Sequence, residues 1–416
     1  MALATVLSGG FMTLVHPFAA SLPGEEYAAF GTMLRLLLLL AIPSAGLQVM
    51  FAQRSAATDP AAIGPLATAT RRTLGLLTGG WLLLAAATWL FQRQLVAALD
   101  LRSPALLWPT LAAAWVSLAL PVFRGLVQGR QDFGTLGGAA ILDGAGRLAA
   151  VYVLVVLFHG QAAAALSAAV IAMLVSTALT AWASRQIWLA PGGDFNWRPF
   201  VRGALPFTAG AGCLLVLSQS DLIFLKLAIP ADLADRFQLS KLYQPAAQIG
   251  FAMTQFTVPL AAVMFPKIAR SFARAEKSDA LRLALTGTAL LGILAAVAAT
   301  LFPELPLRIL FFRTPANWVA APLVPWCAWA MLSFALANVL ANDRLARADF
   351  RFVPWAVGWA FLFLGTLAWL KPQFTTLQPL AAYRLVIAII GGFNLGLLML
   401  IWLSSRFLRP ENREPR

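Results

Sequence analysis

Two opposite charges lie four residues apart inside one apolar run of the sequence, Asp143 and Arg147. Residues i and i+4 share one helix face, so a helical run would bring the two side chains together. A charge in hydrocarbon costs at least roughly 2.5 kcal/mol, so such residues normally face a partner or a wet cavity. The pair is either a self-neutralising contact or an arginine that Asp143 orients toward a bound anion.

Arg35 interrupts a leucine-rich run about two helical turns from its end. Its side chain could extend to the membrane interface. Alternatively, it faces a cleft and offers two parallel hydrogen bonds to a phosphate group. Arg124, which with Arg130 brackets the end of a further run, is a weaker candidate for the same role.

Three more cations border apolar runs, Lys226, Lys241 and Arg384. Each alone is more typical of an interfacial anchor than of a ligand-binding residue. Together with Arg35, they would place four cations toward the outer half of a cleft.

Asp221 is the acidic residue that we expect to couple transport to an ion, because it follows the polar cluster Ser218-Gln219-Ser220. A pair with nearby Lys226 explains it equally well. His16 could titrate near neutral pH, although a lone histidine beside a proline is more often structural. Pro17 and Pro206 are predicted to kink their helices.

The sequence contains no catalytic or nucleotide-binding motif: H-E-x-x-H, the P-loop and G-x-S-x-G are all absent. Its two cysteines, Cys213 and Cys327, lie in apolar runs and indicate no disulfide framework. We therefore expect no enzyme activity, no cofactor, no metal and no transport driven by ATP bound to this chain.

The elements that position these residues follow from composition. Of 416 residues, 60% are hydrophobic and 12% are charged, against about 25% charged in soluble domains. Since about 20 apolar residues span a bilayer, the sequence predicts an all-α integral membrane protein. The twelve expected spans are 3–22, 29–52, 73–91, 105–123, 135–158, 161–183, 203–225, 239–264, 283–303, 318–341, 352–370 and 380–404.

The formal charge of +14 is explained mainly by topology rather than by nucleic acid. With both termini cytoplasmic, most basic residues fall in inner loops, as the positive-inside rule requires. These residues include Arg71, Arg72, Lys267, Arg270, Arg274, Lys277, Arg344, Arg347 and the tail 406–416.

Two short motifs recur in nearly the same register. Val49-Met50-Phe51 returns at 263–265, and Arg130-Gln131-Asp132-Phe133 returns as Arg347-Ala348-Asp349-Phe350. Duplication of six spans would relate two lobes by a pseudo-two-fold axis along the membrane normal, with a cleft between them. The expected divisions are lobes 1–184 and 203–405, a cytoplasmic linker 185–202 and a basic cytoplasmic tail 406–416.

Several stretches resemble the polysaccharide-biosynthesis flippases of the multidrug/oligosaccharidyl-lipid/polysaccharide (MOP) exporter superfamily. They are Gly24-Glu25-Glu26-Tyr27-Ala28-Ala29-Phe30-Gly31 between the first two spans, Gln128–Phe133 followed by Arg147, Pro206 with Asp221, and Met264-Phe265-Pro266-Lys267. The resemblance implies a bacterial inner-membrane protein that moves an oligosaccharide on undecaprenyl pyrophosphate to the outer leaflet, by alternating access of two lobes. Arg35 and Arg147 would contact the pyrophosphate, with Lys241, Arg384 and Arg124 as further candidates. Its partners would be membrane lipid and glycan polymerase or glycosyltransferase machinery.

Two other functions remain open from sequence. An ion-coupled multidrug or organic-cation antiporter of the same superfamily should prefer acids and aromatics in its site, whereas the residues here are mainly basic. A non-transporting assembly partner of a glycan polymerase should have a closed, apolar core.

Overall fold

The computed structural model describes residues 2–59, 63–99, 101–255, 280–374 and 376–407 of the chain. All the regular elements in these ranges are helical. The long helices of the first half are α1 (Ala2–Ala19), α2 (Gly24–Leu40), α3 (Pro43–Ala57), α4 (Gly64–Leu90), α6 (Leu107–Gly129), α7 (Phe133–Val151) and α8 (Ala162–Ala183). Shorter segments are α5 (Gln92–Ala98), the 3-10 turn η2 (Pro104–Leu106) and η3 (Tyr152–Leu157), a π-helical end of α7.

The second half repeats this plan. Its long helices are α10 (Trp197–Ala228), α13 (Gln244–Gln255), α15 (Ala280–Leu301), α17 (Val324–Ala346), α18 (Val353–Phe374) and α19 (Pro379–Phe407). Its short segments are η4 (Ala231–Leu233), α11 (Ala234–Phe237), α12 (Leu239–Leu242), α16 (Glu304–Leu310) and η5 (Pro315–Leu323), and α9 (Arg185–Trp188) lies between the two halves and contacts α4 and α8.

The described residues form a multi-pass membrane bundle, as expected. Within the described ranges, nine helices are long and apolar enough to cross a bilayer. The other three expected spans correspond to α1, to the α2–α3 pair and to α13. The span predicted over 239–264 includes α13, and its part after residue 255 lies outside the described residues. The second span was predicted to be continuous over 29–52, and this prediction was wrong: it divides between α2 and α3 ahead of Pro43, which lacks the N–H that a helix interior needs.

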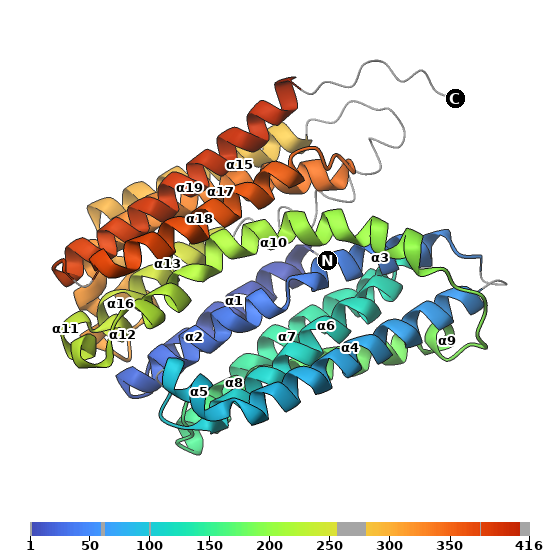
Figure 1. The fold of residues 1–416 in the computed structure, drawn as a ribbon, viewed down its shortest axis with the longest axis horizontal. Coiled ribbons are helices and arrows are strands. Elements are labelled where there is room, and N and C mark those ends of the chain that lie inside the picture. The colour runs from blue at the N-terminus through green and yellow to red at the C-terminus, as the bar shows by residue number, and fades with distance from the viewer. Residues whose placement is uncertain (1, 60–62, 100, 256–279, 375, 408–416) are drawn as a thin grey trace.

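Helix packing confirms the two-lobe fold, because the pairs of the first half recur in the second. In the first half, the packed pairs are α1–α7, α3–α6, α4–α6, α6–α8 and α7–α8. The equivalent pairs of the second half, in the same order, are α10–α18, α13–α17, α15–α17, α17–α19 and α18–α19. In Figure 1, α10 runs between the two groups of helices, and it contacts α2 and α3 on one side and α17 to α19 on the other.

The repeated turn motif has one backbone conformation in both lobes. Gln131 and Ala348 both have positive φ, 59° and 52°. The next amide in each turn reaches back five residues, from Asp132 N to Val127 O (3.2 Å) and from Asp349 N to Arg344 O (2.9 Å). This geometry is typical of a helix that ends in a left-handed residue. The other repeated motif, at 263–265, lies outside the described residues.

Alternation of the helices defines two faces of the bundle. The terminal face carries the start of α1 and the α6–α7 and α17–α18 turns. The hairpin face carries the α1–α2, α7–α8, α10–α13 and α18–α19 connections. Contacts on the hairpin face join these connections: the Ala162 amide donates to Glu26 (3.0 Å), and the Tyr383 hydroxyl donates to the Phe237 carbonyl (2.9 Å).

Candidate substrate-binding site

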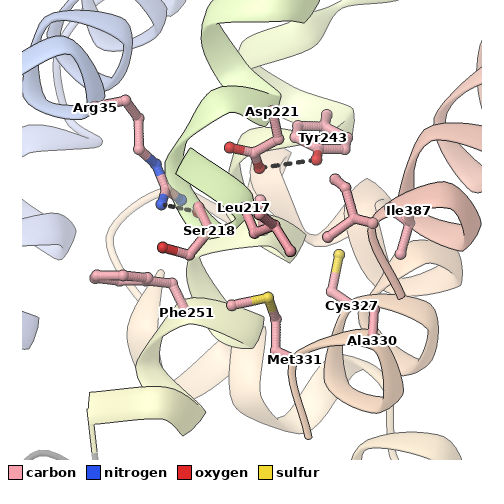
Figure 2. A pocket seen from close by; sticks show the side chains of 12 residues that line it. Arg35, Leu217, Ser218, Asp221, Tyr243, Phe251, Cys327, Ala330, Met331 and Ile387 are labelled. Atoms are coloured by element: carbon pink, nitrogen blue, oxygen red, sulfur yellow. Dashed lines mark hydrogen bonds between the residues drawn. The ribbon is translucent and has the colours of Figure 1, made fainter. Parts of the chain in front are cut away.

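Arg35 joins the two lobes at the centre of the bundle (Figure 2). Its Nη1 donates to the Ser218 carbonyl (3.1 Å) and to Oε1 of Gln219, both on α10. Its guanidinium also lies 4.8 Å from the ring centroid of Phe251 on α13, within cation–π range. The side chain is 5% exposed. The alternative that Arg35 extends to the membrane interface is therefore wrong.

Asp221 lies in the same pocket as Arg35, on the side of the second lobe (Figure 2). Its Oδ2 accepts a hydrogen bond from the Tyr243 hydroxyl at 2.9 Å. Its buried Oδ1 has no hydrogen-bond partner among the described residues. The pocket, also lined by Cys327 and Phe251, has a volume of about 20 Å³, which is room for about one water or small ion.

The second charged cluster lies within the first lobe and centres on Asp143. Its carboxylate accepts from Arg147 Nε at 2.9 Å and from Arg124 Nη2 at 3.4 Å. Arg124 also donates to the Ser176 hydroxyl on α8 (3.1 Å). The contact expected from the i, i+4 spacing of Asp143 and Arg147 is therefore formed. Since two guanidinium groups share one carboxylate, the cluster carries a net positive charge.

A larger cavity between the lobes brings Arg147 and His16 to one surface. Its volume is about 130 Å³, and its polar lining residues include Thr13 on α1 and Gln248 on α13. Phe251 lines both this cavity and the Arg35 pocket. The two sites thus share one aromatic wall, and the charged groups beside it are mainly arginines.

The two lobes contact each other on the hairpin face. Gln244 of α13 donates from Nε2 to the Tyr27 carbonyl (2.9 Å), and the Tyr27 ring meets Phe311 edge-on at 6.5 Å. A Cβ at Gly24 would lie 2.9 Å from Ser240 Oγ, and one at Gly31 would lie 2.4 Å from Gln244 Nε2. The glycines of the motif between the first two spans are therefore where the second lobe approaches α2.

The remaining candidates do not join Arg35. Lys241 is exposed on the short helix α12, and Arg384 lies over the Trp326 ring at 5.6 Å. Lys241 and Arg384 therefore do not lie with Arg35, as the expected group of four cations would require.

The two prolines occupy different positions in their helices. Pro17 lies in the last turn of α1, whereas Pro206 lies inside α10, which continues through it. Met264, Phe265, Pro266 and Lys267, which carried part of the resemblance, lie outside the described residues.

Tyr243, Gln244 and Phe251 were not anticipated as site residues. Their types gave no signal, because an uncharged polar or aromatic residue in an apolar run is ordinary. In the part of the chain that the structure describes, no group of three or more His, Cys, Asp or Glu side chains could hold a metal ion.

Comparison with solved structures identifies the class of fold. An inward-facing multidrug-resistance MATE transporter of the MOP superfamily matches with a TM-score of 0.71 at 13% identity, covering 98% of this chain and 94% of that chain. An outward-facing MATE structure gives a TM-score of 0.68 at 12% identity, covering 97% and 95%. A MOP superfamily transporter from Pyrococcus furiosus, described as having a binding pocket of reverse polarity that suggests a different function, gives 0.63 at 14% identity, covering 98% and 94%.

The family follows from the sequence comparison. The model of the polysaccharide biosynthesis protein family matches residues 2–272. The chain therefore belongs to that family and has the fold of MOP-superfamily transporters. No curated protein matched the sequence.

Proposed function

We propose that the protein is a flippase that moves a lipid-linked oligosaccharide, carried on undecaprenyl pyrophosphate, between the leaflets of a bacterial inner membrane. The observation that carries the proposal is the pair of arginine sites at the centre of the bundle, one buried (Arg35) and one partly buried (Arg147). Arg35 lies between the lobes with neutral partners, and Arg147 lines the adjoining cavity. Arginine forms paired, charge-assisted hydrogen bonds to phosphate, so these sites suit a pyrophosphate group.

In this proposal the lobes 1–184 and 203–405, joined by the linker 185–202, alternate their openings around the fixed arginines. The terminal face and the tail 406–416 lie in the cytoplasm, because that orientation places most basic loops inside. Asp221, whose Oδ1 is unpaired among the described residues, and His16 are the groups proposed to couple the cycle to an ion. Glycan polymerase or glycosyltransferase machinery would supply and receive the substrate.

Two rival functions fit the described site less well. An organic-cation antiporter needs an excess of negative charge in its cavity, yet Asp143 is already shared by Arg124 and Arg147. The reversed pocket polarity reported for the Pyrococcus furiosus protein gives a precedent for a different function on this fold. A non-transporting scaffold would need no charged or polar side chains in a cavity between the lobes, whereas His16, Gln248 and Arg147 line the cavity here, among mainly apolar residues.

Export of glycan in a strain that lacks its own flippase tests the proposal. Arg35→Gln and Arg147→Gln should each lower export by about tenfold or more, because one charge-assisted hydrogen bond to the substrate contributes about 1.5–3 kcal/mol. Arg93→Gln, at an exposed residue of α5, is the matched control and should export normally. Normal export by both cavity variants at equal protein levels would refute the cationic site.

A further inference from the structure

A groove on the outside of the second lobe runs between α17 and α19, with α15 at its edge. It has a volume of about 360 Å³ and is lined mainly by apolar and small side chains. The lining includes Trp326, Trp329, Gly391, Gly392 and Leu395. Both tryptophans and Leu395 are more than 40% exposed, so the groove opens sideways, where a membrane protein meets lipid.

We propose that this groove holds the isoprenoid chain of the lipid-linked substrate after its pyrophosphate has left Arg35, with Arg384 binding the pyrophosphate in that state. The inference rests on the proposed function and assigns the place where the hydrocarbon part of the substrate lies.

Small residues create the groove. A Cβ at Gly391 would lie 3.2 Å from the Cβ of Ala330, so α17 and α19 approach closely there, and Asn394 Nδ2 fixes the crossing by donating to the Ala330 carbonyl (3.2 Å). A Cβ at Gly392 would meet nothing within 4 Å. Gly391 therefore permits the close crossing that forms the floor, whereas Gly392 leaves open the space that a chain would fill.

Arg384 supplies the charge that a phosphate group requires. Its guanidinium lies over the ring of Trp326, which lines the groove. Trp326 is in the first turn of α17, and Arg384 is near the start of α19. Its buried Nε has no hydrogen-bond partner among the described residues, and no ion pair to a described carboxylate involves it. On α19 the lining runs from Ile387 to Leu395, about 12 Å of helix, and Arg384 lies about one turn before it. A phosphate at Arg384 would therefore direct its chain into the groove, toward the middle of the bilayer.

The groove also adjoins the central site. Ala330 and Ile387 line both the groove and the Arg35 pocket, so these two side chains form the wall between them. Figure 2 shows Ala330 and Ile387 on the side of that pocket away from Arg35. A lipid-linked substrate would use such neighbouring sites in turn, because its pyrophosphate passes from Arg35 to Arg384 while its chain stays in hydrocarbon. Under the proposed orientation, Arg384 lies at the leaflet that receives the substrate.

Photo-labelling tests the groove. The purified full chain in lipid nanodiscs would be labelled by a polyprenyl phosphate with a diazirine in its chain, and the labelled peptides mapped by mass spectrometry. We expect labels within 325–333 and 387–395. Gly392→Leu should lower labelling about fivefold, because its side chain fills the groove, and leucine favours a helix more than glycine does.

Gly365→Leu is the matched control, since Gly365 is an exposed helical glycine of α18 with open space around its Cβ. It should label like the unmodified protein. Arg384→Gln should lower labelling by the phosphate probe about tenfold and leave labelling by the corresponding polyprenyl alcohol unchanged.

Three results would overturn the inference: unchanged labelling in Gly392→Leu, equal loss in Gly365→Leu, or equal labelling by a diazirine phospholipid, which would mark ordinary lipid contact. The assay measures binding, so it separates the two proposals. Translocation without labelling of the groove would contradict the groove alone, whereas labelling without translocation would contradict the flippase function alone.

Discussion

At the scale of single residues, the two central arginines differ in what neutralises them. Arg147 and Arg124 share Asp143. Arg35 contacts a carbonyl, an amide oxygen and an aromatic ring, and forms no ion pair with a described carboxylate. A buried cation without an ion-pair partner is costly unless a ligand uses it. Arg35 is therefore the residue best placed to bind an anion.

Because Arg124 and Arg147 share Asp143, removing the carboxylate should destabilise the protein more than removing one of the two guanidinium groups. Asp143→Asn should lower the free energy of unfolding by about 2 kcal/mol, because it leaves two partly buried guanidinium groups without their carboxylate. Arg147→Gln should cost only about 1 kcal/mol, since Arg124 still neutralises Asp143. Thermal unfolding followed by tryptophan fluorescence in detergent measures both. Equal destabilisation by the two variants would show that Arg124 does not compensate.

Only some of these contacts can be predicted from the sequence. The Asp143–Arg147 contact follows from helical spacing alone. The partners of Arg35 are 183 and 184 residues away on α10, and only the packing of two lobes brings them together. For the same reason Lys241 and Arg384 could not be separated from Arg35 before the helices were placed.

At the scale of elements, the two repeated turns carry backbone strain that the sequence does not remove. A left-handed residue with a Cβ costs roughly 1 kcal/mol more than glycine. Ala348→Gly should therefore raise the free energy of unfolding, by up to about 1 kcal/mol after the extra chain entropy of glycine is subtracted. Ala346→Gly, two residues earlier at the end of α17, is the control and should destabilise. Thermal unfolding of both variants decides the matter, and destabilisation by Ala348→Gly would contradict the assigned strain.

The α17–α18 turn also predicts a dependence of stability on pH. Hydrogen bonds from Arg351 and then Arg344 lower the pKa of Asp349 from 3.8 to about 2. Since the folded pKa is below the unfolded value, the stabilisation of about 1–2 kcal/mol is complete above pH ~4 and is lost as the pH falls through about 2. Asp349→Asn should flatten the stability profile between pH 5 and 2. An unchanged profile would exclude Asp349 as its source.

The membrane-spanning helices can largely be predicted from the sequence, whereas the breaks and short helices between them cannot. Long apolar runs bounded by charges locate the spans because hydrocarbon requires helices. Pro43 was a signal for the α2–α3 break, yet the surrounding apolar run hid it. The short helices α11, α12 and α16 on the hairpin face pack mainly on neighbouring segments of the second lobe, such as η4 and η5. No periodic pattern predicts these contacts.

At the scale of the whole molecule, Gly31 leaves room for the Gln244 side chain, which bonds to Tyr27 on the hairpin face. Gly31→Leu should push Gln244 away from α2 and separate the lobes at that face. Spin labels at Gln161→Cys and Lys241→Cys, exposed on opposite lobes, would report the separation in a Cys213→Ala, Cys327→Ala background. We expect the distance distribution to move to longer values.

Gly79→Leu is the control for that experiment, because a Cβ at Gly79 of α4 would meet nothing within 4 Å. It should leave the distances unchanged. An unchanged distribution in Gly31→Leu would mean that the Gln244–Tyr27 contact does not hold the face closed.

The central claim is that Arg35, between the lobes, binds the anionic head of a lipid-linked glycan while the protein transports it. Its most direct test is translocation of undecaprenyl-pyrophosphate oligosaccharide in proteoliposomes by the unmodified protein, Arg35→Lys and Arg35→Gln, each matched for thermal stability. We expect rapid translocation by the unmodified protein, partial activity with lysine, and a loss of about tenfold or more with glutamine. No translocation by the unmodified protein, or equal rates in Arg35→Gln, would contradict the claim.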